Sequence, residues 1–212
     1  MKMGESRSLA HSGRIIAIEG VDAVGKQTQS VLLQSWFKDH GFKVSSFSFP
    51  DYRTPIGKEI KAFLDGRRNF QPEVRHMLFA ANRWEKASQI REAQSESDAI
   101  VVNRYTESNL VYGLANGLRL DWLVWLERGL PKSDLVVVLD APSKGLASRR
   151  PGKKDSYEKD SDLQGRVQTL YKELAPKFGW MIVDGSKSIR RVHGSIVEAV
   201  TANLDRSAGA RK

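Results

Sequence analysis

Short apolar runs alternate along this chain with longer segments in which apolar residues recur at helical spacing. The runs have the length of buried strands, and we expect five of them, at 15–19, 43–49, 99–102, 135–139 and 181–183. Strands that alternate with helices are typical of βαβ units around a parallel sheet. The pattern therefore predicts an α/β protein with a five-stranded parallel sheet flanked by helices.

Helical period is clear in the segments that follow Gly25 and precede Gly66. We expect further helices at 73–96, 120–128, 163–175 and 188–204. Right-handed crossovers would place these helices on both faces of the sheet. The carboxyl ends of the strands would then open onto one shared crevice.

Composition narrows the class of protein. A chain of 212 residues, 40% of them apolar, suits one globular domain, and no repeat or linker divides it. The longest apolar run, 135–141, is too short to cross a bilayer, which excludes an integral membrane protein. Without Cys there is no disulfide framework and no Cys-ligated zinc. The absence of Cys is compatible with any redox compartment. Residues 1–13 lack the apolar segment of a secretory signal peptide, which excludes such a peptide. We expect disordered tails at 1–13 and 206–212 around a domain at 14–205, since the C-terminal residues are small and charged.

The charge of the chain points to phosphate. Lys and Arg number 34 against 25 Asp and Glu, a formal net charge of +9. Such a chain favours nucleotides, nucleic acid or anionic surfaces as partners, and the charge does not choose among them.

The first predicted strand leads directly into GVDAVGK, which begins at Gly20 and has the G-x-x-x-x-G-K spacing of a phosphate-binding loop. In such a loop, backbone amides and a helix N-terminus hold phosphate oxygens, while the lysine neutralises the β and γ phosphates. Gln27 stands where Ser or Thr usually binds Mg²⁺, and its amide oxygen can still coordinate a hard cation or accept from its water. The predicted ATP phosphate contacts are Gly20, Ala23, Val24, Gly25, Lys26, Gln27 and Thr28.

From about Arg14 to His193 the chain resembles the thymidylate kinases in the order and spacing of six segments, among them GVDAVGKQTQ, FPDYRTP, LFAANRW and VNRYTESNLVY. The resemblance implies a P-loop nucleoside monophosphate kinase fold with a basic lid. It implies transfer of the γ-phosphoryl group of ATP to dTMP, which gives ADP and dTDP, with Mg²⁺ carried by ATP. It also implies a cytoplasmic homodimer, for which Trp122 and Trp125 are interface or core candidates. Neither nucleic acid nor a membrane is expected as a partner.

The resemblance assigns the sugar and phosphate of dTMP to three residues. Asp22 would receive the 3′-hydroxyl, although its position alone suits a residue that caps the loop. Tyr52 would meet the acceptor phosphate, and Arg53 would add charge there if its side chain points inward.

The thymine base is assigned in the same way. Phe79 would stack on the base, and Arg83, four residues along the same helix face, would reach a base oxygen. By helical spacing alone, Phe79 suits the core better than a site. Ser108 and Asn109 match the pair that contacts the base, and Tyr112 matches the ring that excludes a ribose 2′-hydroxyl.

The resemblance also identifies catalytic residues. Arg104, at the end of the third strand, would bridge the donor and acceptor phosphates and offset charge during transfer. Asn103 stands where the family has Asp, so Gln27 and Asn103 are the two altered residues around the expected metal. Together with Lys26, Arg104 is the main catalytic candidate.

The basic segment at about 143–160 corresponds to the lid, and Pro-Gly interrupts it. Arg149 and Arg150 are predicted to supply positive charge to the triphosphate, and Arg149 alternatively stacks on adenine. A solvated charged loop is the alternative interpretation of this segment. Ser186 and Lys187, after the last strand, are predicted to contact adenine, and a simple strand-to-helix turn explains them equally well.

Three alternative functions stay open. A kinase for another nucleoside monophosphate would keep the phosphate loop and change the acceptor pocket. A nucleotide-binding protein without transferase activity is suggested by Gln27 and Asn103. Nucleic-acid binding is suggested by the charge of +9 alone, since no recognition motif supports it.

Overall fold

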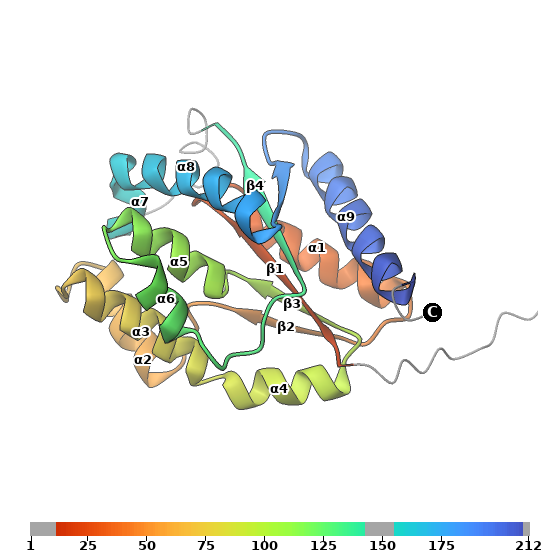
Figure 1. Ribbon diagram of the computed structural model, residues 1–212, viewed down its shortest axis with the longest axis horizontal. Coiled ribbons are helices and arrows are strands. Elements are labelled where there is room, and N and C mark those ends of the chain that lie inside the picture. Colours follow the sequence, from red (N-terminus) through yellow and green to blue (C-terminus); the bar gives the residue numbers. More distant parts are fainter. Residues whose placement is uncertain (1–11, 143–154, 210–212) are drawn as a thin grey trace, which may run out of the picture.

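The computed structural model describes residues 12–142 and 155–209. In these residues one parallel sheet has the strand order β2-β3-β1-β4-β5 (Figure 1). The strands are β1 (Arg14–Gly20), β2 (Val44–Ser48), β3 (Ala99–Asn103), β4 (Leu135–Asp140) and β5 (Met181–Asp184). The prediction of a five-stranded parallel sheet flanked by helices is confirmed.

The strand order creates a crevice at the middle of the sheet. β1 pairs with β3, with Ile18 opposite Asn103. After β1 the chain crosses toward the β2 edge, whereas after β3 it crosses to β4 on the other side. Loops that leave adjacent parallel strands in opposite directions diverge, and they leave room for a ligand between them. The segments after Gly20 and Asn103 therefore flank one opening.

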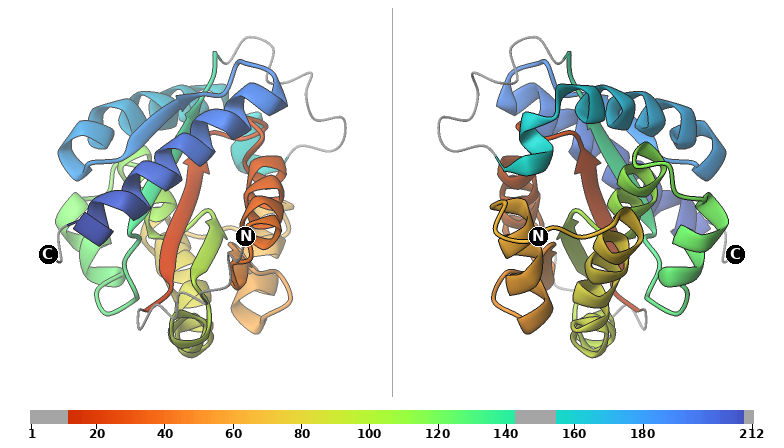
Figure 2. Two further views of the ribbon diagram at one scale, coloured as in Figure 1. Left: turned by 90° about the vertical axis from the view of Figure 1, so that its right-hand side faces the viewer. Right: turned by 90° about the vertical axis from the view of Figure 1, so that its left-hand side faces the viewer.

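Helices cover both faces of the sheet. They are α1 (Lys26–Asp39), α2 (Pro55–Leu64), α3 (Pro72–Trp84), α4 (Ala87–Glu96), α5 (Thr106–Ala115), α6 (Leu120–Leu126), α7 (Ser156–Lys159), α8 (Ser161–Phe178) and α9 (Ile189–Gly209). α1 and α9 pack together on one face, while α4, α5 and α8 contact the other (Figure 2). α2, α3 and α6 form a further layer beside α5.

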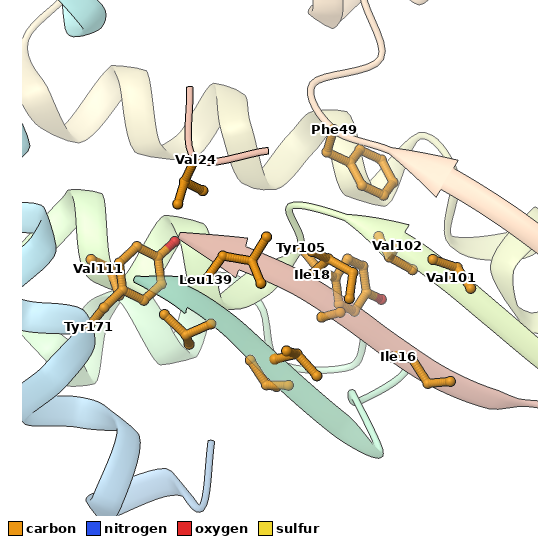
Figure 3. Packing of buried hydrophobic residues seen from close by; sticks show 14 of the residues in the cluster. Ile16, Ile18, Val24, Phe49, Val101, Val102, Tyr105, Val111, Leu139 and Tyr171 are labelled. Atoms are coloured by element: carbon orange, nitrogen blue, oxygen red, sulfur yellow. The ribbon is translucent and has the colours of Figure 1, made fainter. Parts of the chain in front are cut away.

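The core is built from strands that are buried on both faces. Ile18, Val102 and Leu139, from the three central strands, lie among Tyr105 and Tyr171 in Figure 3, and all five are at most 2% exposed. Such strands read as apolar runs rather than as alternating patterns. Each buried aliphatic side chain contributes about 1.5–3 kcal/mol. The sheet is thus a rigid base for the loops at its carboxyl edge.

The helix predicted at 73–96 is two helices. α3 ends at Trp84, whose indole Nε1 donates to the Leu126 carbonyl at 3.0 Å. The Glu85 carboxylate turns back to the Asn82 side chain at 3.0 Å, and Lys86 leaves the helical conformation. One tertiary contact and one local contact thus mark the end of α3, within a segment where the apolar period continues.

α5 was not predicted. Eight of its ten residues are buried, so the helix has no polar face to give it a period. Its first turn carries Ser108 and Asn109 into the interior, next to the end of β3.

The predicted tails and the predicted lid fall mostly on residues 1–11, 143–154 and 210–212, which lie outside the described residues. α9 continues to Gly209. None of the helices within 12–142 and 155–209 is both long enough and apolar enough to span a membrane.

Glu107 is a buried carboxylate from which we expect the stability of the fold to depend on pH. Its carboxylate is 7% exposed, and Oε2 has no hydrogen-bond partner within the described residues. Burial and the nearby Glu19 raise the pKa of Glu107 well above its usual range. The unfolded chain releases this proton near pH 4.3 and the folded protein only at higher pH, so Glu107 destabilises the fold as pH rises between these values.

Glu107→Gln is therefore expected to raise Tm by about 3 °C or more at pH 8, with a smaller rise at pH 5. Thermal unfolding of both proteins at the two pH values measures this. A Tm shift that is the same at pH 5 and pH 8 would contradict the raised pKa.

Candidate active site

Two glycines shape the loop between β1 and α1. Gly20 has φ +133°, and a Cβ there would lie 2.4 Å from the Leu139 carbonyl oxygen. Gly25 has φ +105° and caps α1. Both conformations favour glycine, which explains the spacing seen in the sequence. The loop amides and the N-terminus of α1 consequently face the same opening.

A cavity of about 570 Å³ lies in front of this loop. It receives side chains from the carboxyl ends of β1, β2 and β3 and from α1, α3, α5 and α7. Its volume falls in the range of small-ligand sites. It brings together fourteen predicted site residues, namely Asp22, Ala23, Gly25, Lys26, Gln27, Thr28, Tyr52, Phe79, Arg83, Asn103, Arg104, Ser108, Asn109 and Tyr112.

Arg104 is held firmly at the mouth of the loop. Its backbone has φ +61°, and its amide donates to the Ile18 carbonyl at 3.1 Å. The guanidinium bonds to the Asp22 carboxylate and lies 5.2 Å from the centre of the Tyr112 ring. A residue other than glycine in the left-handed region costs about 1 kcal/mol or more, so the surrounding fold must impose this placement.

Two cations, Lys26 and Arg104, lie against the Asp22 carboxylate at the loop. Lys26 Nζ donates to the Val21 carbonyl at 2.6 Å and lies 3.9 Å from the Asp22 carboxylate. Although burial opposes it, the charges of Arg104 and Lys26 lower the pKa of Asp22 to about 2. Burial and the charge of Arg104 lower the pKa of Lys26 to about 7. The negative charge of a bound polyanion would offset the two cations and would raise the pKa of both Asp22 and Lys26.

Counting partners among the described residues, Asp22 keeps one acceptor site without a hydrogen bond. Its Oδ2 accepts from Tyr112 Oη at 3.2 Å and from Gln164 Nε2 at 3.1 Å, and its Oδ1 accepts from Arg104. A carboxylate offers about four lone-pair sites. The remaining site on Oδ1 is compatible with the predicted contact to a sugar hydroxyl.

Three aromatic side chains, Phe79, Tyr112 and Tyr157, line the part of the cavity that we call the aromatic slot. Tyr112 and Tyr157 stack with ring centres 5.7 Å apart and an angle of 10°, and Phe79 lies 6.3 Å from Tyr157. Arg83, Asn109 and His76 also line the cavity. Aromatic walls and polar groups in one slot suit a planar base with polar edges.

Two amide side chains lie at the loop where a metal is expected. Gln27 Oε1 accepts from Asn103 Nδ2 at 2.8 Å. Asn103 Oδ1 is buried and has no hydrogen-bond partner in the part of the chain that the structure describes. Amide oxygens are hard ligands, and Mg²⁺ is usually held mainly by phosphate and water. These residues therefore fit an ion that arrives with a nucleotide, although no group of three His, Cys, Asp or Glu able to hold a metal occurs among the described residues.

Arg53 is not brought to the cavity. Its side chain is 88% exposed, and its guanidinium pairs with the Asp51 carboxylate at 2.8 and 2.9 Å. Gly20 and Val24 shape the phosphate loop without lining the cavity.

The turn that carries Ser186 and Lys187 lies outside the cavity and against the phosphate loop. Lys187 pairs with Asp184 at 3.3 Å, and a Cβ at Gly185 would lie 2.9 Å from the Val24 side chain. Their contact with adenine stays a prediction. Arg149 and Arg150 lie outside the described residues.

Sequence reasoning missed several residues that shape the site. Glu19 accepts from the Tyr105 amide at 2.7 Å and from the Ser108 hydroxyl at 2.5 Å, and so anchors the segment that carries Arg104. An acidic residue at the end of an apolar strand was a readable signal. The other missed residues are His76, Glu127, Tyr157 and Gln164, and only the folded chain brings them to the site.

Comparison with known proteins identifies the family. The sequence model described as "Thymidylate kinase" matches residues 18–196. The chain belongs to the thymidylate kinase family. Among relatives named thymidylate kinase, the protein of Dictyostelium discoideum is 34% identical over 91% of this chain and 86% of its own length. The human protein is 35% identical over 88% of this chain and 89% of its own length.

A solved structure supports the same assignment. The thymidylate kinase of Candida albicans matches with a TM-score of 0.81 and 30% identity, over 92% of this chain and 94% of the other. The predictions of this family and of its P-loop nucleoside monophosphate kinase fold are therefore confirmed.

Proposed function

We propose that the protein transfers the γ-phosphoryl group of ATP to dTMP, which gives ADP and dTDP. The observation that carries this proposal is one cavity that joins the phosphate loop, Arg104 and an aromatic slot. ATP would bind the loop through its phosphates, and the dTMP base would enter the slot beyond Asp22. The two nucleotides would meet end to end at Arg104.

The residues do little covalent chemistry in this proposal. The acceptor phosphate is an anion at neutral pH, so no strong general base is needed. Lys26, Arg104 and the loop amides hold two polyanions together and offset charge during in-line transfer, and Tyr52 donates to the acceptor phosphate. Mg²⁺ bound with ATP would supply further neutralisation of the β and γ phosphates, and Gln27 and Asn103 are the residues that would hold it or its waters.

Specificity for a deoxy sugar would come from excluded volume. The Tyr112 ring packs against Arg104, and its hydroxyl bonds to Asp22, so the ring cannot move aside without breaking this contact. A 2′-hydroxyl would compete for the same space. We further propose that Arg149 and Arg150 close over the triphosphate and that Ser186 and Lys187 contact adenine. A cytoplasmic location stays a prediction.

A substrate screen tests the reaction, the acceptor and the metal together. ADP release is measured with Mg²⁺, ATP and each of dTMP, dUMP, dCMP, dGMP and UMP in turn. The proposal predicts the highest kcat/KM for dTMP and no turnover when EDTA removes the metal. A preference for another monophosphate would assign a different acceptor, and ATP binding without turnover of any acceptor would indicate a protein without transferase activity.

We also propose a homodimer through the outer faces of α3 and α6. Five large apolar side chains there are 39–66% exposed: Val74, Met77, Trp84, Val124 and Trp125. A groove of about 520 Å³ runs between the two helices. A contiguous exposed apolar face of this kind is typical of a protein interface.

Trp125→Glu is expected to lower the mass in solution from twice 23.8 kDa to 23.8 kDa, because Trp125 is 66% exposed on this face. Light scattering after gel filtration measures the mass. Ile189→Glu is the control, since Ile189 is 60% exposed on α9, which contacts the opposite face of the sheet. A wild-type protein of 23.8 kDa at high micromolar concentration would contradict the proposed dimer.

A further inference from the structure

A chain of buried polar side chains runs from the aromatic slot to the end of α6. Glu127 lies at its centre and is 8% exposed, while Arg83, Asn109 and His76 are at most 3% exposed. We propose that Glu127 is a positioning residue that fixes which hydrogen-bond groups the slot presents to the base, and thereby favours thymine over cytosine. This inference rests on the proposed function.

Glu127 first fixes Arg83. Its Oε2 accepts from Arg83 Nε at 2.9 Å, and its Oε1 accepts from Arg83 Nη2. Two parallel bonds lock the guanidinium plane. Arg83 Nη1 has no hydrogen-bond partner among the described residues, and Arg83 lines the cavity. The slot is therefore given a fixed donor.

Glu127 also fixes the Asn109 amide. Asn109 Nδ2 donates to Glu127 Oε1 at 2.6 Å and to the His76 carbonyl at 3.3 Å. An ionised carboxylate accepts only, so the nitrogen of the amide must face Glu127 and the oxygen must face away. Both N–H groups of Asn109 are thus used inside the protein.

His76 confirms this orientation from the other side. Its Nδ1 is 2.7 Å from Asn109 Oδ1, and its Nε2 is 3.5 Å from the Asn116 amide nitrogen. Burial lowers the pKa of His76 to about 4, so the ring is neutral at pH 7. The amide nitrogen of Asn116 is a donor, which places the single ring proton on Nδ1, where it is donated to Asn109 Oδ1. The second lone pair of this oxygen is left for a ligand.

The slot consequently presents a donor, Arg83, and an acceptor, Asn109 Oδ1. Thymine carries the complementary pair on one edge, the O4 acceptor and the N3–H donor. Cytosine carries the reverse pair, a 4-amino donor and an N3 acceptor, and would leave both protein groups unpaired. A site built on buried hydrogen bonds rejects such a mismatch strongly. Glu127→Gln would weaken this constraint, because the amide N–H group of glutamine cannot accept from Arg83 or Asn109 as a carboxylate oxygen does.

The test compares kcat/KM for dTMP and dCMP in the wild type and Glu127→Gln. We expect the dTMP-to-dCMP ratio to fall about 100-fold, mainly through a higher KM for dTMP. Glu127→Asp retains an acceptor-only side chain and should recover part of the ratio. Glu59→Gln is the matched control, since the Glu59 carboxylate also pairs with an arginine, Arg68, but is 47% exposed on α2.

Circular dichroism and Tm establish that each variant is folded. If Glu127→Gln does not fold, the test uses Glu127→Asp, for which a smaller fall in the dTMP-to-dCMP ratio of kcat/KM is expected. A folded variant that loses turnover of dTMP and dCMP by equal factors would overturn the inference, because Glu127 would then be merely structural. An unchanged ratio would overturn it as well. A wild-type protein that does not phosphorylate dTMP would instead overturn the proposed function, and is recognised before any variant is made.

Discussion

Arg104→Met is expected to lower kcat for dTMP phosphorylation about 1000-fold. The guanidinium lies at the mouth of the phosphate loop, on the Asp22 carboxylate, where the two substrates would meet. Methionine fills a similar volume and carries no charge, so repulsion between the two polyanions would no longer be offset during transfer. Because the effect belongs to the transition state, kcat should fall more than KM rises. Steady-state kinetics with saturating ATP gives both values.

The same variant should remain folded. Arg104 is 16% exposed at the edge of a cavity, and its neighbours Tyr112 and Gln164 still donate to Asp22. Arg68→Met removes an arginine that is 57% exposed in the turn after α2, and is expected to retain wild-type kcat. A folded Arg104→Met protein with kcat within threefold of the wild type would rule out the catalytic role.

Lys26→Met is expected to change activity and stability in opposite directions. Turnover should fall about 1000-fold, since the variant loses the cation that neutralises the β and γ phosphates. Tm at pH 7 should rise by several degrees, because burial and Arg104 disfavour the charged lysine and lower its pKa to about 7. In the unfolded chain the lysine has a pKa near 10.4 and is fully charged at pH 7. The lower pKa in the folded protein therefore reduces the free energy of unfolding at pH 7, and methionine removes this loss.

Differential scanning fluorimetry and the ADP-release assay measure the two effects on one preparation. Lys38→Met is the matched control, because Lys38 lies in the exposed last turn of the same helix. The control should alter neither turnover nor Tm appreciably. A lower Tm for Lys26→Met would contradict the electrostatic strain at the loop, even if activity were lost.

The strands of the sheet were predictable because most of their residues are buried on both faces of the sheet. Strands such as β3 and β4 have both faces covered by helices, so they read as apolar runs with sharp ends. The loop from Gly20 to Lys26 was equally readable, since two of its three residues with positive φ, Gly20 and Gly25, are glycines at the spacing of a phosphate-binding loop, the third being Ala23. The strand order was not readable, because it depends on which strands pair across the sheet.

The rest of the site depends on contacts between distant segments. α5 is buried on nearly every side, which erases the period that reveals a helix. Arg83 and Glu127 are 44 residues apart, and Asp22 and Gln164 are 142 apart. No local sequence pattern predicts such pairs. Arg53 shows that a local contact can also decide a side chain's direction. The resemblance allowed Arg53 to point toward the acceptor phosphate, but its guanidinium pairs with Asp51, two residues away, and is exposed.

Binding of one molecule that mimics both substrates tests the central claim most directly. Adenosine and thymidine joined through their 5′ positions by five phosphates would span the loop and the slot if the two nucleotides lie end to end. Calorimetry should show one molecule bound per chain, displacement of both ATP and dTMP, and binding at least tenfold tighter than either, with most of that gain lost in Arg104→Met. Displacement of only one nucleotide, or equal affinity in Arg104→Met, would contradict the account.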